Sequence, residues 1–182
     1  TEKLYNEYAH RYIQTFPHHE LDLEVYSEDP TLKYPHTPLD KSYYHKHEHE
    51  PRPNTYKQDY LRFHWKPLTV YTAALTHLGE YHSLLWIDAD TEFLQVIDQA
   101  WIDRNLHNKN TTVSYMGREG THSECGLLYY NLQHPKTLDF ITEMWSLYTT
   151  EKIHELEETH DSYVFDWLRT RWEKKGIAKF KN

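Results

Sequence analysis

The feature that most constrains the fold is a short apolar run that ends in two carboxylates. Residues 84–87 are all apolar, and Asp88 and Asp90 follow directly. A run of this length without polar alternation is typical of a strand that is buried on both faces of a sheet. Such a strand would deliver both aspartates to the edge of the sheet at which open α/β folds bind their ligands.

Two aspartates separated by one residue can converge on a single hard divalent cation. Mg²⁺ and Mn²⁺ prefer oxygen ligands and often complete their coordination shell with substrate phosphates. The alternative interpretation is a solvated acidic turn, which is the more frequent reason for an isolated Asp-x-Asp pattern. The buried strand before Asp88 and the pattern that follows it favour the metal site.

Length, charge and cysteine content narrow the class of protein. The 182 residues suit one domain, 1–182, with a full-size core, and the formal net charge of −8 argues against non-specific nucleic-acid binding. The single cysteine, Cys125, excludes an intrachain disulfide and fits a reducing compartment. No apolar run approaches the ~20 residues of a membrane span. We therefore expect a cytoplasmic domain without a membrane span or a nucleic-acid partner.

Hydrophobic periodicity predicts strands that alternate with helices. Pro67 either begins a second helix within residues 56–78 or kinks one helix there. Residues 28–54 are rich in Pro, His and charge and lack periodicity, which predicts a long polar loop. The expected helices are 2–16, 56–78, 97–106, 161–174 and one after Pro135 with Leu138, Ile141, Met144, Trp145 and Tyr148 on its apolar face; the expected strands are 21–26, 84–87, 112–116 and 126–130.

This alternation indicates an α/β sandwich. Such a domain normally opens with a strand, whereas residues 2–16 have a helical pattern. We therefore expect that a short N-terminal strand of the native protein is missing from this chain.

Three blocks of the sequence resemble glycosyltransferases of the GT-A fold, in the order in which those enzymes carry them. Leu85-Trp-Ile-Asp-Ala-Asp-Thr91 resembles their acidic pair after a buried strand. Residues 123–131 are similar to the strand whose small residues face the donor sugar, and residues 159–166 are similar to the late acidic helix start. The resemblance covers residues 56–172.

The resemblance implies a fold and an activity. The fold would be a Rossmann-like α/β/α sandwich with a mixed central sheet. The activity would be metal-dependent transfer of a sugar from a nucleotide-diphosphate sugar to a glycan or another hydroxyl acceptor. Mn²⁺ or Mg²⁺ would stabilise the diphosphate leaving group as a Lewis acid. The missing first strand helps to bind the nucleotide base in GT-A proteins, so base recognition is not assigned.

The predicted metal ligands are Asp88, Asp90 and His160. Asp90 is the first choice for direct ligation, whereas Asp88 would bind the metal through water or hold a ribose hydroxyl of the donor. The resemblance suggests His160 as a third ligand because of its place in the late block. An equally weighted alternative is that His160 is a polar neighbour of a helix cap.

Two carboxylates are candidates for catalysis. Asp161 stands at a predicted helix start, where it would be either an N-cap or, in an inverting enzyme, the base for the acceptor hydroxyl. Glu124 would grip sugar hydroxyls, unless it is an exposed loop acid. Arg62 and Lys66 are four residues apart and would contact the donor diphosphate, although a solvated basic face is the more frequent role of such a pair.

Two other functions remain open. A phosphohydrolase of the haloacid dehalogenase type also places two aspartates after an apolar strand. The pattern of that family has Thr or Val four residues after the first aspartate, where this chain has Glu92. A non-catalytic glycan-binding module on the same fold is the other alternative, since a fold does not fix a function. The alternating histidines of residues 45–49 are expected in a solvated loop, and Cys125 is expected to be a packing residue.

Overall fold

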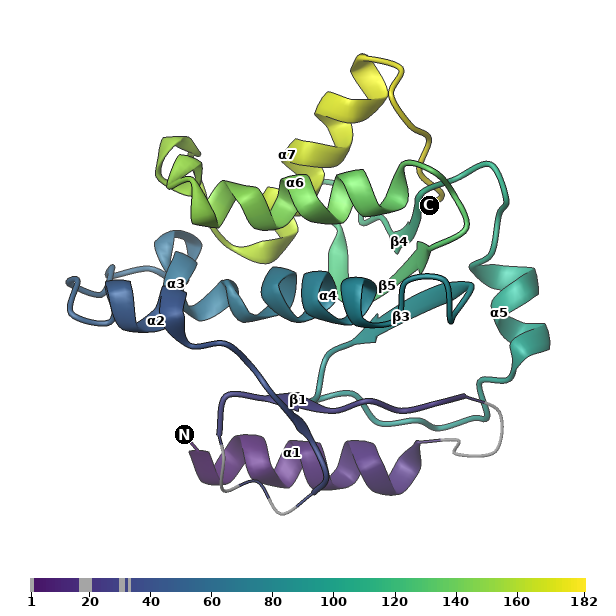
Figure 1. Cartoon of the computed structure of the whole chain (residues 1–182), viewed down its shortest axis with the longest axis horizontal. Helices are drawn as coiled ribbons and strands as arrows, with labels where there is room; N and C mark the ends of the chain where they lie inside the picture. The colour runs from purple at the N-terminus through teal and green to yellow at the C-terminus, as the bar shows by residue number, and fades with distance from the viewer. Residues whose placement is uncertain (1, 17–20, 30–31, 33) are drawn as a thin grey trace.

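The computed structural model describes residues 2–16, 21–29, 32 and 34–182 (Figure 1). Its centre is an antiparallel sheet in the strand order β3-β5-β4, formed by Ser83–Ile87, Glu124–Asn131 and Val113–Met116 respectively. The register pairs Ile87 with Leu127. The carboxyl end of β3 therefore lies beside the amino end of β5, and the residues that follow β3 meet those that begin β5.

Side chains alternate between the two faces of this sheet. Leu85 of β3 and its cross-strand partner Tyr129 of β5 pack against the smaller of two apolar clusters. Their neighbours along each strand point the other way, because successive side chains of a strand face opposite sides. The residues that contact the larger cluster are Leu84, Trp86, Leu128 and Tyr130.

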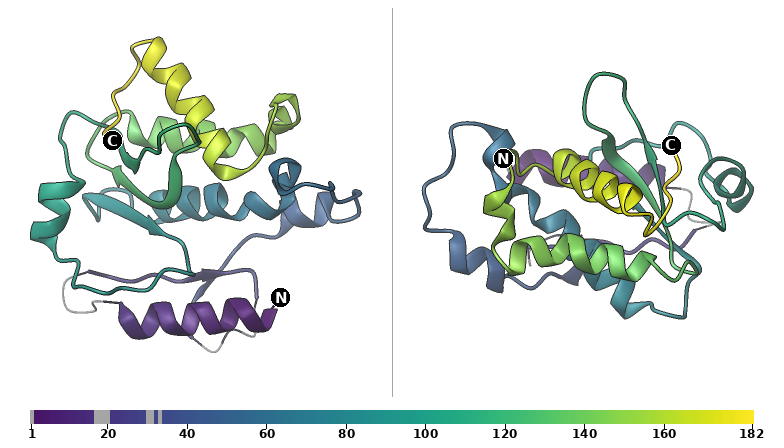
Figure 2. Two further views of the ribbon diagram at one scale, coloured as in Figure 1. Left: turned by 180° about the vertical axis from the view of Figure 1, so that it is seen from behind. Right: turned by 90° about the horizontal axis from the view of Figure 1, so that it is seen from above.

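Three helices cover the face with the larger cluster. They are α4 (Trp65–Thr76), α6 (Thr137–Thr149) and α7 (Asp161–Lys174). Helix α4 contacts β3 and α6, and α7 contacts β5 and α6 (Figures 1 and 2). The predicted inward faces of both later helices are confirmed: Ile141, Met144 and Tyr148 of α6 and Val164, Leu168 and Trp172 of α7 are buried, and Leu138 and Trp145 pack at the margin of the cluster.

The opposite face of the sheet is covered by α5 (Gln99–Asn105), which lies apart from the other helices (Figure 1). Ile102 and the adjoining Leu106 pack there against Tyr129, and Leu21 joins them from an earlier segment. Asp98 caps α5, because its carboxylate accepts a hydrogen bond from Trp101 N at 2.7 Å. Helices thus flank both faces of the sheet, and the predicted α/β class is confirmed.

The amino-terminal part of the chain departs from the prediction. Helix α1 (Glu2–Thr15) matches, but the strand expected at 21–26 is reduced to β1 (Tyr26–Ser27), which pairs in parallel with β2 (Thr37–Pro38). The alternation of apolar and acidic residues correctly indicated one-sided burial at Leu21. The same alternation does not predict strand pairing, because pairing depends on a partner strand elsewhere in the chain.

The predicted polar loop 28–54 is also partly wrong. In addition to β2 it contains helix α2 (Ser42–His47), on which Tyr43 and His47 are buried. The Tyr43 ring lies 5.1 Å from the His64 ring and 5.7 Å from that of Trp145, measured between centroids. Aromatic and imidazole rings therefore anchor this helix, which hydrophobic periodicity does not detect because few of its residues are aliphatic.

The helix predicted at 56–78 is divided into η1 (Tyr56–Gln58), α3 (Tyr60–Phe63) and α4. Asp59 causes the first break, because its backbone is non-helical and its carboxylate accepts a hydrogen bond from Arg62 N. Pro67 lies in the first turn of α4, where a missing N–H breaks no helical hydrogen bond. The second-helix interpretation of Pro67 is thus confirmed.

The chain returns to the sheet after α7. A short η2 helix (Lys152–Glu155) precedes α7, and beyond α7 Lys181 forms a parallel bridge with Ser114 of β4. The segment after α7 therefore pairs with β4 through a single bridge. Among the described residues, no helix has both the length and the apolar character that crossing a bilayer requires.

His64, at the junction of α3 and α4, gives a pH-dependent prediction. Its ring is fully buried, and Nδ1–H donates to the Leu61 carbonyl at 2.8 Å. Burial lowers the pKa of this imidazole from 6.5 to about 4. The unfolded chain therefore binds the extra proton first as the pH falls. The contribution of neutral His64 to the free energy of unfolding is complete above pH 6.5 and is lost towards pH 4, with a slope approaching about 1.4 kcal/mol per pH unit.

Urea unfolding at pH 7.0, 6.0 and 5.0 measures this slope. His64→Gln should flatten it, whatever its effect on stability at pH 7. His82→Gln is the control, because it removes an exposed histidine and should leave the slope of the wild type unchanged. Equal slopes for the wild type and His64→Gln would show that another group is responsible.

Candidate active site

The candidate site lies where β3 ends and β5 begins. Asp88 follows the last residue of β3, and its backbone N–H donates to the Gly126 carbonyl at 2.9 Å. The antiparallel register thus brings Asp88 beside the segment Glu124–Gly126, which the sequence separates from it by more than thirty residues. The predicted delivery of Asp88 to the edge of the sheet is confirmed.

The centre of the site is the ammonium group of Lys66, which reaches in from α4. Its Nζ lies 2.9 Å from Asp88 Oδ1, donates to the Cys125 carbonyl at 2.9 Å and forms an ion pair with Asp161. It also lies 5.5 Å from the centroid of the Trp86 ring, where the face of the indole attracts a cation. We call Lys66, Asp88 and Asp161 the Lys66 cluster.

The Lys66 cluster is partly shielded from water. The side chains of Lys66 and Asp161 are 12% and 16% exposed, whereas that of Asp88 is 35% exposed. Burial by itself would lower the pKa of the Lys66 ammonium, but the charges of Asp161 and Asp88 outweigh burial and raise it. Lys66 is therefore a permanent cation, and it holds carboxylates from two distant segments in place.

Glu124 and Gly126 form the floor of the site beside Asp88. A Cβ atom built on Gly126 would lie 3.1 Å from Glu124 Oε1 and 3.5 Å from Asp88 Oδ2, so both carboxylates approach the backbone of this glycine closely. Oε1 of Glu124 accepts the Gly126 N–H at 2.9 Å, and Oε2 lies 3.0 Å from Arg118 Nη1. Glu124 is thus a partly buried strand residue, and the exposed-loop alternative is wrong.

Asp161 is positioned by α7. The helix begins at Asp161, and the N-cap position belongs to His160. The predicted alternative that Asp161 is the cap is therefore wrong by one residue. One carboxylate oxygen accepts the Ser162 N–H at 2.9 Å and the other contacts Lys66. The helix N-terminus also favours a negative charge at this position.

Two predicted residues lie outside the Lys66 cluster. Asp90 is exposed, and its side chain forms no hydrogen bond or ion pair within the described part of the chain. Arg62 is also exposed, with its guanidinium 5.5 Å from the centroid of the neighbouring Phe63 ring. Of the two cations predicted on one helical face, Lys66 points into the site, whereas Arg62 lies at the surface.

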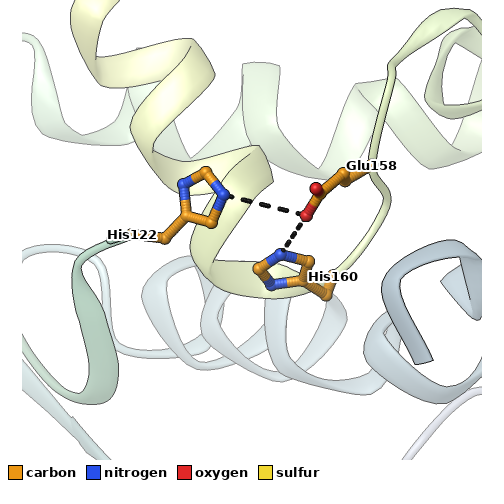
Figure 3. Close-up of side chains that lie close together, drawn as sticks. All are labelled: His122, Glu158 and His160. Carbon is orange, nitrogen blue, oxygen red and sulfur yellow. Dashed lines mark hydrogen bonds and ion pairs between the residues drawn. The ribbon is translucent and has the colours of Figure 1, made fainter. Parts of the chain in front are cut away.

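His160 lies in a separate group of side chains with His122 and Glu158 (Figure 3). Over the described residues, this is the one set of at least three His, Cys, Asp or Glu side chains whose ligand atoms lie within 4.8 Å of one another. Asp88 and Asp90 are not part of it, so the geometry gives no support to His160 as their third ligand. His122 and Glu158 were missed in the sequence, although each lies within two residues of a block that resembles GT-A enzymes.

A cavity of about 710 Å³ opens beside both groups. Asp161 belongs to its wall and to the Lys66 cluster, and His122 and His160 line it as well. Two cationic side chains, Arg118 and Lys57, also line this cavity. The volume falls in the range of about 300–1,000 Å³ that small-molecule sites occupy. Cys125 is buried behind this region, as predicted for a packing residue, and burial raises the pKa of its thiol.

The donor atoms of Asp88 and Asp90 fit a hard divalent cation. Asp88 Oδ1 already receives Lys66 Nζ and a hydrogen bond from Trp86 Nε1 at 2.6 Å, so Oδ2 is the atom it offers. Asp90 offers an exposed carboxylate two residues further on. An oxygen-only donor set with room for further ligands is what Mg²⁺ and Mn²⁺ prefer.

Comparisons of this chain with protein-family models, with curated proteins and with solved structures found no match.

Proposed function

We propose that this protein is a metal-dependent glycosyltransferase with a GT-A-like fold. It would transfer a sugar from a nucleotide-diphosphate sugar to a hydroxyl acceptor. The observation that carries the proposal is the convergence of Asp88 and Asp161 on the Lys66 ammonium at one end of the sheet, with Glu124 beside Asp88. These residues come from the three blocks of sequence that resemble the GT-A enzymes.

The acidic pair has a role that matches its position. Asp88 through Oδ2 and Asp90 would hold Mn²⁺ or Mg²⁺, which supplies Lewis-acid stabilisation for a diphosphate leaving group when it is bound. Without a cation, two carboxylates repel a diphosphate. Lys66 fixes the orientation of Asp88 and contributes one positive charge beside it. It would thereby limit the local negative charge that the donor meets.

Glu124 and Gly126 would contact the donor sugar. The Glu124 carboxylate is held from both sides by the Gly126 N–H and Arg118, so its remaining lone pairs have a fixed direction. Sugar hydroxyls donate hydrogen bonds to such carboxylates, and charge-assisted bonds of this kind are stronger than neutral ones. The missing side chain of Gly126 allows the Glu124 and Asp88 carboxylates to lie close together beside this backbone.

Asp161 would be the general base. Its carboxylate lies on the cavity wall, where an acceptor hydroxyl can approach. The Lys66 ion pair and the Ser162 N–H hold it in a single orientation. A positioned base of this kind takes the proton of the acceptor hydroxyl as the new glycosidic bond forms.

A binding experiment tests the metal requirement. UDP and GDP are titrated by calorimetry and thermal shift in the presence of Mn²⁺, and then with excess chelator. At least one nucleotide should stabilise the protein with Mn²⁺ by about 2.7 kcal/mol at a hundredfold excess over its Kd. The chelator and Asp90→Ala should each abolish this stabilisation.

Asp103→Ala is the matched control for Asp90→Ala, because it removes another exposed aspartate, on α5, which accepts a hydrogen bond from Gln99 at 2.8 Å. It should bind like the wild type. Nucleotide affinity that is the same with Mn²⁺ and with chelator would contradict the proposal.

A further inference from the structure

His122, Glu158 and His160 meet at the wall of the cavity, away from the Lys66 cluster. His160 Nε2 lies 2.8 Å from Glu158 Oε2, and His122 Nε2 lies 3.7 Å from the same oxygen. Figure 3 shows both rings turned towards this carboxylate, His122 from the loop before β5 and His160 from the segment that leads into α7. Two imidazole nitrogens and one oxygen thus face a common point.

The segment that carries Glu158 and His160 is fixed by its neighbours. Thr159 N donates to the Lys57 carbonyl at 2.7 Å, and Gln58 Nε2 donates to the Glu157 carbonyl. Both bonds attach the segment to η1. The hydrogen bonds to η1 therefore position Glu158 and His160 independently of the contact between their side chains.

The two oxygens of Glu158 have different partners. Oε1 lies 2.7 Å from Lys57 Nζ at the surface, whereas Oε2 faces both imidazoles. His122 is held on its other side, where Nδ1 lies 3.9 Å from Asp166 Oδ2. Metal-binding histidines commonly have a carboxylate behind the ring that fixes its orientation. The arrangement thus leaves one nitrogen of each ring and one oxygen for a shared ligand.

The spacing suits a small cation. Metal–ligand distances of about 2.0–2.2 Å in a tetrahedral zinc site place neighbouring ligand atoms about 3.3 Å apart. The observed separations of 2.8 and 3.7 Å from Glu158 Oε2 lie on either side of that value, so small side-chain rotations suffice. Imidazole suits Zn²⁺, Co²⁺ or Ni²⁺ better than Mg²⁺, which favours oxygen ligands.

We propose that His122, Glu158 and His160 bind one divalent cation of the zinc and cobalt class, as a centre separate from Asp88 and Asp90. Three protein ligands leave a coordination position open. Because His122 and His160 line the cavity, that position faces the space where a small molecule would bind. The proposal does not depend on the glycosyltransferase function, since it concerns the binding of the metal alone.

Cobalt titration of the metal-free full chain tests this centre. In a large excess of Mg²⁺, which occupies oxygen-only sites such as Asp88 and Asp90, Co²⁺ should still bind one site with visible d–d absorption, and Zn²⁺ should displace it. Co²⁺ affinity should fall by at least about tenfold in each of three variants, His122→Asn, Glu158→Gln and His160→Asn. Substitution of a residue that only orients a metal ligand already lowers metal affinity by about tenfold or more. His122→Asn is the most informative variant, because its side chain is 36% exposed and folding should tolerate the change.

The double variant His45→Asn/His49→Asn is the matched control. It removes two histidines with side chains that are 61% and 88% exposed, and it leaves the proposed ligands untouched. It should bind Co²⁺ like the wild type. Unchanged Co²⁺ affinity in all three ligand variants, or an equal loss in the control, would overturn the proposal.

Discussion

Asp161→Asn is expected to lower sugar transfer by about a hundredfold or more, the usual contribution of a positioned general base. Asn keeps the shape of the side chain, and its one carbonyl oxygen can still accept a hydrogen bond from Ser162 N, but it cannot take a proton from the acceptor. Lys66 also retains its ion pair with Asp88 at 2.9 Å. The variant should therefore fold and bind nucleotide, and turnover is measured per folded molecule.

Asp139→Asn is the matched control for this change. Asp139 occupies the first turn of α6 as Asp161 does in α7, but its side chain is 58% exposed and pairs with Lys136 at the surface. It should leave transfer unchanged. Normal turnover of folded Asp161→Asn would show that the base lies elsewhere, or that the enzyme retains configuration and needs no base here.

Lys66→Met is expected to lower the free energy of unfolding by about 3 kcal/mol. Removing one partner of a buried ion pair typically costs about 3–5 kcal/mol, because the remaining charge is left uncompensated. Here two carboxylates are left facing each other, and the Cys125 carbonyl loses its donor. The low end of the range applies because Asp88 is 35% exposed and can recruit water. Methionine keeps most of the packing volume, so the loss reports the charge.

Lys136→Met provides the comparison for urea unfolding. Lys136 and Asp139 form a surface pair whose side chains are 46% and 58% exposed, so this change should cost at most about 0.5 kcal/mol. If the two lysine variants lose the same stability, the Lys66 cluster is not the structural centre of the site.

The sequence predicted the central part of the fold because that part has strong local periodicity. Helix α7 begins and ends where the pattern placed it, at Asp161 and Lys174, and the inward residues of α6 were identified correctly. Helix α2 was missed because its buried residues are Tyr43 and His47, which do not form an aliphatic stripe. The strand at 21–26 was overestimated because one-sided burial resembles strand alternation.

The candidate site was predictable where it follows from the ends of elements. Asp88 was recognised at the end of a strand, Glu124 beside a small residue and Asp161 at a helix start. Lys66 was predicted either to contact the donor diphosphate or to lie on a solvated face, whereas the structure buries it in ion pairs with Asp88 and Asp161. The group of His122 with Glu158 could not be predicted, because it depends on contacts between segments that are far apart in the sequence.

One measurement tests the central claim most directly. The protein is incubated with UDP- and GDP-sugars and Mn²⁺, and release of the nucleoside diphosphate is followed by chromatography. Hydrolysis of a phosphomonoester and binding of free glycans are measured in parallel. A glycosyltransferase should release nucleoside diphosphate from at least one donor, and both chelator and Asp88→Asn should abolish the release. Release that persists with chelator, turnover of the phosphomonoester, or binding of glycans without any use of donor would contradict the proposed function.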